Sequence, residues 1–295
     1  MSQKVAAIVV TYNRKQMLLQ CLEGLLNQSF PIDQIIVVDN ASTDGTEQLL
    51  EENNYLSHAR IRYQRLPQNT GGAGGFHAGL AQGLLTHADW FWLTDDDVCP
   101  QPDCLSELIR YRGVSECLHP RIVLLNNDYF KWEQTFDLTT LGRTHTDDIS
   151  FQNEKEIAFT NVGCFEGMLV SRRIVEKIGL PNAEYFISDD DTLFGLKASA
   201  HTNVAYVKAA KMNKLLSIAP VSPWKSYFIV RNKFYLRTDG LNYFRVRSTY
   251  KQDTLFILSQ LTDVIRYSRM GRNYVGPAVR GFIHGIRYHA LHKSV

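Results

Sequence analysis

The sequence predicts an α/β fold with a mainly parallel sheet, followed by a helical appendage. In the first third of the chain, short apolar runs rich in β-branched residues alternate with segments of helical periodicity. Strands that alternate with helices lie parallel, because each helix carries the chain back to the same end of the sheet. After Pro223 the composition changes, and aromatic and basic residues interleave over a helical pattern. We therefore expect a main domain over residues 1–222 and a basic helical region over 223–295.

The order of these patterns gives the expected elements. They are a strand at 5–10, a helix with an apolar face at 18–26, strands at 35–38 and 61–64, helices at 46–52 and from the glycines 71–75 to about 85, a strand at 90–94, a helix at 105–111, a strand at 167–170 and a helix at 172–178. Asp44 with Glu47 fits a capping box before the helix at 46–52, and Gly179 marks the end of the helix at 172–178. The less regular segment 106–157 is interpreted as a variable insertion.

Composition excludes several classes of protein. Lys and Arg number 32 against 30 Asp and Glu, so the net charge of +2 lacks the positive excess typical of nucleic-acid-binding proteins. The five cysteines include no Cys-x-x-Cys pair, which favours reduced thiols. The N-terminus shows no signal-peptide pattern, and every apolar run is shorter than the ~20 residues that span a bilayer. We expect a cytoplasmic protein with no nucleic-acid partner.

Three consecutive acids, Asp95, Asp96 and Asp97, follow the predicted strand at 90–94. The carboxyl ends of parallel strands form the ligand-binding edge of an open sheet. Alternate side chains of an extended run share a face, so Asp95 and Asp97 can converge on one cation while Asp96 points elsewhere. Mg²⁺ and Mn²⁺ prefer such carboxylate oxygens. An acidic turn that caps the next helix explains these residues equally well.

A second acidic run, Asp189, Asp190 and Asp191, follows the aromatic segment 185–187 and precedes a helical pattern. One of these carboxylates could serve as a general base, with its pKa set by its like-charged neighbours. On spacing alone, acids that stabilise a helix N-terminus are the better explanation.

Two further segments could hold a nucleotide. Asp39 and Asn40 end the second predicted strand, where they could hydrogen-bond a base or a ribose. The segment from Asn69 through Gly74 and Gly75 offers backbone N–H groups ahead of a helix, which suits a diphosphate. No Gly-Lys-Ser/Thr follows, so this is not a Walker loop. A flexible turn explains the glycines equally well.

Taken together, the motifs resemble those of family 2 inverting glycosyltransferases. They are Thr-Tyr-Asn-Arg at 11–14, Val-Val-Asp-Asn-Ala-Ser-Thr-Asp at 37–44, Asn-Thr-Gly-Gly-Ala-Gly-Gly-Phe at 69–76 and Asp-Asp-Asp at 95–97. The resemblance covers residues 5–102 and continues more loosely over 167–195. The glycine-rich stretch and both acidic runs look most like galactofuranosyltransferases, with rhamnosyltransferases next. The resemblance implies a GT-A type fold, in which a Rossmann-like sheet binds a nucleotide sugar, with a donor half over 1–104 and an acceptor half over 157–222.

Carried over position by position, the resemblance implies roles for single residues. The implied donor-binding residues are Thr11, Tyr12, Arg14, Asp39, Asn40, Asn69, Gly74, Gly75, Asp95 and Asp96, with Asp39 at the uracil. Asp95 and Asp97 are implied to hold Mn²⁺ or Mg²⁺. Asp191 is the implied general base, with Asp190 its nearest rival. The implied acceptor-side residues are Gly167, Trp224, Tyr227 and Arg231.

Two positions depart from the family's pattern. Leu193 stands where galactofuranosyltransferases have a Glu shortly after the Asp pair. The His that the family commonly supplies as a further metal ligand is absent from 211–224, and His201 is the nearest candidate. We therefore expect Asp95, Asp97, the diphosphate and water to hold the metal.

The implied activity is the inverting, metal-assisted transfer of galactofuranose from UDP-galactofuranose to a hydroxyl of a glycan or lipid-linked saccharide. The resemblance implies a polyprenyl-diphosphate-linked acceptor and the synthesis of a cell-surface polysaccharide such as an O-antigen or capsule. A dTDP-rhamnose-dependent rhamnosyltransferase is the alternative, and a non-catalytic nucleotide-sugar-binding protein is the alternative of another class. A nucleotidylyltransferase is disfavoured, because the loop at 11–14 contains no glycine.

The C-terminal region is basic, with nine Lys or Arg after Leu241 against Asp253 and Asp263. Such a region suits peripheral contact with an anionic membrane, at the cytoplasmic face of the inner membrane. The apolar side chains expected to make that contact are Tyr267, Tyr274, Phe282, Ile283, Ile286 and Tyr288. A solvated helical face is the alternative.

Overall fold

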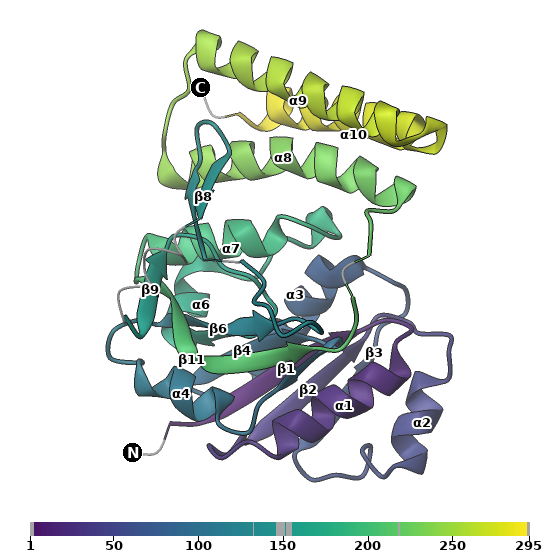
Figure 1. The fold of residues 1–295 in the computed structure, drawn as a ribbon, viewed down its shortest axis with the longest axis vertical. Coiled ribbons are helices and arrows are strands. Elements are labelled where there is room, and N and C mark those ends of the chain that lie inside the picture. Colours follow the sequence, from purple (N-terminus) through teal and green to yellow (C-terminus); the bar gives the residue numbers. More distant parts are fainter. Residues whose placement is uncertain (1–2, 132, 146–150, 152–154, 218, 294–295) are drawn as a thin grey trace.

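A central sheet covered by helices on both faces forms the body of the molecule, and long C-terminal helices stack beyond it (Figure 1). This architecture is seen in a computed structural model that describes residues 3–131, 133–145, 151, 155–217 and 219–293. The predicted α/β class and the helical character after Pro223 are confirmed.

The sheet mixes parallel and antiparallel strands. Its strands are β1 (Val5–Thr11), β2 (Gln34–Asp39), β3 (Ile61–Arg65), β4 (Trp90–Asp95), β5 (Val98–Pro100), β6 (Cys117–Val123), β9 (Ile157–Thr160), β10 (Met168–Ser171) and β11 (Val204–Lys214). Their order is β3-β2-β1-β4-β10-β6-β11-β5, and β9 pairs with β11. A separate hairpin consists of β7 (Gln134–Asp137) and β8 (Gly142–His145).

The helices lie on both faces of this sheet and beyond it. They are α1 (Lys15–Leu26), α2 (Thr46–Glu52), α3 (Gly71–Leu84), α4 (Cys104–Arg110), α6 (Arg172–Ile178), α7 (Asp190–Ser199), α8 (Pro223–Phe244), α9 (Tyr250–Met270) and α10 (Arg272–His292), with a short 3-10 turn at Ala183–Tyr185.

Alternation along β1 explains the two cores. Val5, Ala7 and Val9 pack with α1 and α4 on one face, and the side chains between them pack with α3 and α6 on the other. All of these side chains are buried, and full burial of an aliphatic side chain contributes about 1.5–3 kcal/mol. The nearly continuous apolar run is therefore the signature of a strand covered on both faces.

The strand register brings several segments to one edge of the sheet. Thr11 pairs with Asp39, so the parallel strands β1 and β2 end side by side. β10 runs antiparallel to β4, which places the residues before Met168 beside the end of β4. β11 runs antiparallel to β5, with Lys214 opposite Val98. Polar residues from five strands can therefore meet at this edge.

Three expectations about local structure are wrong. The glycines 71–75 do not precede a helix but form the first turns of α3. The glycines of this helix let it approach β1 closely, since a Cβ on Gly79 would lie 2.4 Å from Cγ2 of Ile8. The helix at Thr46–Glu52 begins as predicted, yet Gly45 occupies the cap position. The carboxylate of Asp44 accepts hydrogen bonds from the N–H and the hydroxyl of Thr46, so there is no capping box with Glu47.

The described part of 106–157 is not only an insertion, because β6 lies inside the main sheet between β10 and β11.

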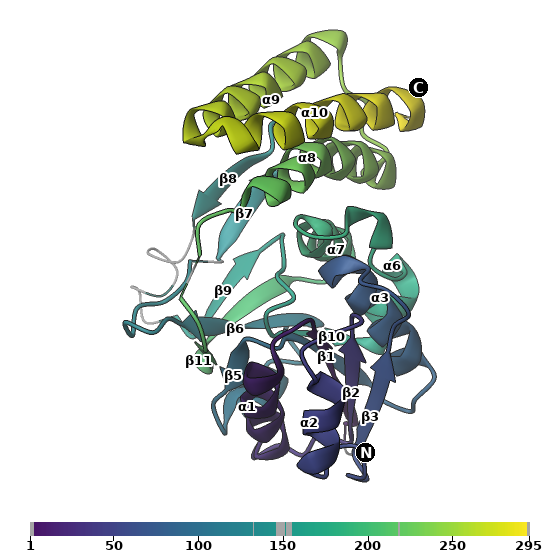
Figure 2. The same cartoon turned by 90° about the vertical axis from the view of Figure 1, so that its right-hand side faces the viewer.

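The C-terminal helices form a layer of their own. α8 packs closely on α10, and α9 lies against α10 (Figure 2). A Cβ on Gly281 would lie 2.3 Å from the carbonyl oxygen of Tyr227, so glycine permits the close approach of α10 to α8. Among the helices of the described residues, none is both long enough and apolar enough to cross a membrane.

The side chains expected to contact a membrane are mostly covered. Tyr267 is buried between the helices, Tyr274 donates to the carbonyl of Val221, and Tyr288 stacks on Tyr235. Of the six named residues, Ile283 is exposed. That expectation is therefore wrong for most of its residues, because they form the packing layer between helices.

Candidate active site

Two adjoining pockets lie at the edge of the sheet where the strands meet. The central pocket has a volume of about 640 Å³ and is lined by acids of both predicted runs and by Glu166. The donor-side pocket has a volume of about 240 Å³ and is lined by residues of β1, of segment 69–72 and of the loop before α7. Arg14, Asp95 and Lys225 line both pockets, so a ligand in one borders the other.

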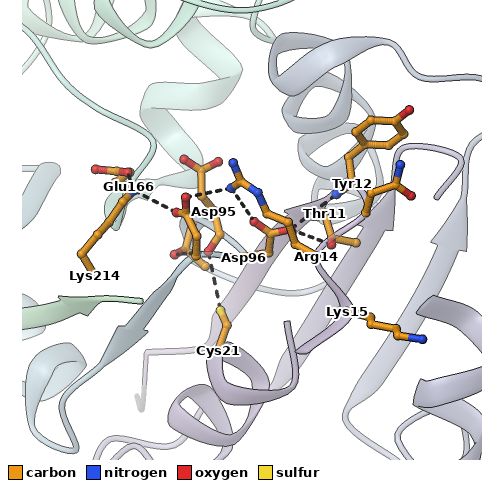
Figure 3. Close-up of polar contacts among 12 residues, drawn as sticks. Thr11, Tyr12, Arg14, Lys15, Cys21, Asp95, Asp96, Glu166 and Lys214 are labelled. Atoms are coloured by element: carbon orange, nitrogen blue, oxygen red, sulfur yellow. Dashed lines mark hydrogen bonds and ion pairs between the residues drawn. The ribbon is translucent and has the colours of Figure 1, made fainter. Parts of the chain in front are cut away.

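Asp95, Asp97 and Glu166 form an acidic cluster, with ligand oxygens within 4.8 Å of one another (Figure 3). Asp95 ends β4, and Glu166 reaches it because β10 runs antiparallel to β4. Burial, followed by the charges of Asp97 and Glu166, raises the pKa of Asp95 well above its ordinary value. A divalent cation would remove this repulsion, and Mg²⁺ or Mn²⁺ prefers such oxygen ligands. The residues therefore fit the predicted cation, with Glu166 as a third candidate ligand.

Two basic side chains neutralise this cluster. Nη1 of Arg14 donates to Oδ2 of Asp97 at 2.7 Å and to Oδ1 of Asp96 at 3.1 Å. Nζ of Lys214 donates to Oδ1 of Asp97 at 2.9 Å and also to Glu166. Both carboxylate oxygens of Asp97 thus have a basic partner.

Asp96 points away from the acidic cluster, as predicted, although it lies in the turn after β4 and not in an extended run. Its Oδ2 accepts from Oγ1 of Thr11 at 2.7 Å, and it lines the donor-side pocket. Burial raises the pKa of Asp96 to about 6, although Arg14 opposes the shift. Thr11 is buried by this contact, whereas Tyr12 is exposed at the pocket rim.

The second acidic run begins α7 and also faces the central pocket. Asp190 and Asp191 stand in the first turn of α7 and also line the central pocket, so they both begin a helix and face a possible ligand. The preceding Phe186, Ser188 and Asp189 have φ values of 64°, 72° and 65°. Residues other than glycine held in this region cost about 1–3 kcal/mol each. Surrounding contacts must therefore hold the loop in place.

Those contacts come from α8. Nδ2 of Asn232 lies 3.0 Å from the carbonyl oxygen of Tyr185, 2.7 Å from that of Ile187 and 2.8 Å from that of Ser188. Nη2 of Arg231 donates to the carbonyls of Glu184 and Tyr185 at 2.7 and 2.8 Å. Arg231 is buried, so its guanidinium supports the loop that precedes the acids.

The two acids at the start of α7 differ in their titration. Burial and then Asp189 raise the pKa of Asp191 to about 6, opposed by the backbone N–H of Thr192 at 2.6 Å. Burial and then Asp191 raise the pKa of Asp190 well above its ordinary value. A carboxyl with a pKa near 6 is ionised at neutral pH and still accepts a proton readily. Asp191 is therefore the better candidate base.

Of the residues implied to meet the nucleotide, Asp39 lines neither pocket, whereas Asn40 and Asn69 hold segment 69–72 at the donor-side pocket. Asp39 is 1% exposed, and its oxygens accept from the backbone of Ser42 and the hydroxyl of Tyr63. Asn40 donates to the carbonyl of Gly71 at 3.0 Å, and Asn69 accepts from the N–H of Gly71 at 2.8 Å. Asn40 and Asn69 line the donor-side pocket as well.

The glycines at this pocket are Gly71 and Gly72. Gly74 and Gly75 face inward, since a Cβ on Gly75 would lie 2.4 Å from Cγ1 of Val10, and one on Gly74 would lie 2.3 Å from Oγ1 of Thr70. Gly74 and Gly75 line neither of the two pockets, and the donor-binding role implied for them stays a prediction.

The implied acceptor-side residues are spread over three environments. Trp224 is 49% exposed and lines the donor-side pocket. The hydroxyl of Tyr227 lies 2.8 Å from Nδ1 of His284, and the carbonyl of buried Gly167 accepts from Trp92 at 2.9 Å. Arg231 supports the loop before α7, so Trp224 is the one of these four that lines a pocket among the described residues.

The structure adds residues that sequence reasoning missed. Glu166 directly precedes the predicted strand at 167–170, and Lys214 stands in the segment 211–224, which contains no His. Arg143 on β8 donates to Asp189 at 3.2 Å and to Thr192 at 3.3 Å, and it lines the central pocket. A charged residue next to either end of a buried strand is the sequence signal that indicates Glu166 and Lys214.

The two positions that depart from the family's pattern, Leu193 and His201, line neither of the two pockets. Leu193 is 3% exposed and packs in a core cluster with Tyr185 and Leu236. Nε2 of His201 lies 2.8 Å from the hydroxyl of Tyr243, and His201 lines neither pocket.

Comparison with known proteins agrees with this geometry. The sequence profile of glycosyl transferase family 2 matches residues 6–179. Galactofuranosyltransferase GlfT1 of Mycolicibacterium smegmatis is 26% identical, over 92% of this chain and 97% of the relative. S. aureus TarS 1–349 has a TM-score of 0.56 at 17% identity, over 97% of this chain and 91% of that one. Mannosyltransferase PcManGT from Pyrobaculum calidifontis, solved with GDP-Man and Mn²⁺, has a TM-score of 0.58 at 14% identity, over 100% of this chain and 89% of that one. These structural likenesses confirm the predicted GT-A type fold.

Proposed function

The chain belongs to glycosyl transferase family 2, and from that premise we propose that it transfers galactofuranose from UDP-galactofuranose to a hydroxyl of a growing glycan, with inversion. The observation that carries the proposal is the central pocket, which is lined both by an acidic cluster that could hold a cation and by Asp191, whose pKa is raised to about 6. Similarity to a galactofuranosyltransferase along nearly the whole length of both chains supports the choice of sugar.

The two acidic groups divide the chemistry of a single displacement. The acceptor hydroxyl loses its proton to Asp191 as its oxygen attacks the anomeric carbon, and the nucleoside diphosphate leaves from the opposite face. A divalent cation bound by Asp95, Asp97 and Glu166 would neutralise charge on that leaving group. Arg14 lines both pockets, so it can contact the same diphosphate.

The donor nucleotide fits the donor-side pocket in this proposal. Tyr12 and Trp224 present exposed aromatic faces there, and Asp96 offers a carboxylate to a ribose or sugar hydroxyl. Gln134 of β7 and Arg143 of β8 line the central pocket together with Asp191. A sugar-linked acceptor would therefore enter across the β7–β8 hairpin.

The test is donor binding and slow donor hydrolysis on a panel of UDP-galactofuranose, UDP-galactopyranose, UDP-glucose and dTDP-rhamnose. Each donor is measured with Mn²⁺ and with EDTA, on wild type and Asp97→Ala. Metal-dependent selectivity for UDP-galactofuranose that is lost in the variant is the expected result. A preference for dTDP-rhamnose would make the protein a rhamnosyltransferase. Donor binding without hydrolysis or transfer would indicate a non-catalytic binding protein, and no binding to any donor would overturn the transferase proposal.

We propose further that the acceptor is polyprenyl-diphosphate-linked and that the outer face of α9 rests on an anionic membrane at the cytoplasmic side. Leu255, Leu258, Leu261 and Ile265 are 39–57% exposed on this face, at the three- and four-residue spacing of one helical stripe. Exposed Lys251 and Arg269 flank the stripe, whereas the acids Asp253 and Asp263 are engaged by Arg237 and Lys233. Apolar side chains bordered by basic ones are typical of interfacial helices.

Liposome flotation tests this membrane proposal. Wild type should float with vesicles that contain phosphatidylglycerol and remain behind with neutral phosphatidylcholine vesicles. Leu258→Glu should abolish flotation, whereas Val114→Glu, at an exposed apolar position on the main domain, should not. Equal flotation of wild type and Leu258→Glu would overturn the proposal.

A further inference from the structure

The acidic cluster Asp95, Asp97 and Glu166 already contains a cation that belongs to the chain. Nζ of Lys214 bridges Asp97 and Glu166, two of the three candidate metal ligands. The contact to Oδ1 of Asp97 is 2.9 Å long. The ammonium is therefore paired with two carboxylates that a divalent ion in this cluster would also have to gather.

The fold holds Lys214 at this place through its backbone. Lys214 ends β11, where it pairs with Val98 of β5, and the N–H of the next residue, Leu215, donates to the carbonyl of Asp97 at 2.8 Å. The side chain of Lys214 is 13% exposed, against 41% for Arg14. Of these two cations, Lys214 is thus the one built into the cluster, and its flexible four-carbon stem is the part that can move.

An ammonium and a divalent cation compete for these oxygens. A Mg²⁺ ion needs its oxygen ligands at about 2.0–2.1 Å, which would place it within a few ångströms of Nζ of Lys214. Two positive centres at that distance repel strongly inside a partly buried site. Conversely, three carboxylates within 4.8 Å with neither cation present would repel one another.

We propose that Lys214 is the resident cation of the acidic cluster and that a divalent cation binds there only by displacing its ammonium. The free protein then keeps the cluster neutralised without metal, and metal binding requires the Lys214 side chain to swing out. This inference rests on the metal site of the proposed function, yet it concerns the affinity of the protein for the ion and not sugar transfer.

Mn²⁺ binding, followed by electron paramagnetic resonance with no donor present, tests the displacement. The variants are Lys214→Met, which keeps the length of the stem and removes the charge, and Lys214→Arg, which keeps the charge. Lys225→Met is the matched control. Lys225 lines the same pocket, but its Nζ lies over the ring of Trp224, 5.7 Å from the ring centroid, whereas Nζ of Lys214 pairs with the acids. Lys214→Met should bind Mn²⁺ at least about tenfold more tightly than wild type, a gain of about 1.4 kcal/mol. Lys214→Arg and Lys225→Met should stay within about threefold of wild type, a difference of under 1 kcal/mol.

Thermal unfolding gives a readout that does not depend on the metal signal. Lys214→Met should unfold at a lower temperature than wild type in EDTA and should recover more than wild type on addition of Mn²⁺. Equal Mn²⁺ affinity in wild type and Lys214→Met, or no Mn²⁺ binding by any variant, would overturn the proposal.

If Lys214→Met does not fold, the wild-type protein itself provides the test. Reductive methylation with mass-spectrometric readout should modify Lys214 slowly in EDTA and several-fold faster in saturating Mn²⁺, with Lys225 as the internal reference. Unchanged modification of Lys214 would overturn the proposal. A protein that shows the competition but hydrolyses no donor would overturn the proposed function alone, whereas metal-dependent transfer without the competition would overturn this inference alone.

Discussion

Two runs of three aspartates contribute to one pocket, which all of them but Asp96 line, and their surroundings give them different chemistry. Asp95 ends β4, and Asp96 and Asp97 form the turn after it, where Arg14 and Lys214 supply two positive charges. Asp189 to Asp191 begin a helix after a constrained loop, where Arg143 pairs with Asp189. The first run is therefore suited to holding a cation and the second to accepting a proton. Environment, and not residue type, separates the roles of identical side chains.

The sharpest test of this division is Asp191→Asn. The amide keeps the shape of the side chain but cannot accept the proton, so kcat should fall by about 10²–10⁴ while donor binding stays near wild type. Steady-state transfer rates and donor titration measure the two quantities. Asp189→Asn is the matched control within the same run and should lose far less activity. If Asp191→Asn retained more than a tenth of wild-type activity, Asp190 would become the candidate base.

Loss of the third candidate ligand should have the next largest effect. Glu166→Gln removes one of three charges from the cluster, so the Mn²⁺ concentration that gives half-maximal activity should rise by about tenfold to 100-fold. Activity at saturating Mn²⁺ should fall less. Glu116→Gln is the control, because Glu116 pairs with Arg173 away from the pocket. An unchanged Mn²⁺ requirement in Glu166→Gln would leave Asp95 and Asp97 as the protein ligands.

The contrast between the two runs also explains what could be predicted from sequence. The alternation of an extended run predicts that Asp95 and Asp97 converge and that Asp96 turns away, and the structure has both features, although Asp96 and Asp97 lie in the turn between β4 and β5. The positions of these three side chains are local properties of one short segment. Glu166 and Lys214 join the site only through antiparallel pairing of β10 with β4 and of β11 with β5, between segments far apart in the chain.

The same distinction holds for the fold. The helix at Arg172–Ile178 has the predicted bounds, since its periodicity and Gly179 are local signals. β6 is not evident from the sequence, because its place between β10 and β11 depends on long-range pairing and because His119, Pro120 and Arg121 interrupt its apolar pattern. The conformation of the loop before α7 depends in the same way on Asn232 and Arg231 from α8.

The pH dependence of transfer should report the second acidic run. Burial raises the pKa of Asp191 to about 6, so the group is ionised above that pH and protonated below it. A base must be ionised to accept a proton, so kcat/KM should rise with pH through about 6 and level off above it, with a fall of about fivefold between pH 6 and pH 5. The residual rate of Asp191→Asn should lack this limb. A limb that persists in the variant would assign it to Asp96, whose pKa is also raised to about 6.

The smallest expected effect concerns the support of the second run by α8. Asn232→Ala removes the amide that lies within hydrogen-bonding distance of the carbonyls of Tyr185, Ile187 and Ser188. Buried carbonyls that lose their donor cost about 1–3 kcal/mol each, partly recovered by rearrangement, so the free energy of unfolding should fall by about 2 kcal/mol. Asn242→Ala, near the other end of α8, is the matched control for loss of an amide that donates to His292. Because the loop carries Asp191 into the pocket, kcat of Asn232→Ala should fall several-fold while the Mn²⁺ requirement, set by the first run, stays unchanged. A matching rise in the Mn²⁺ requirement would show that the two runs are not independent.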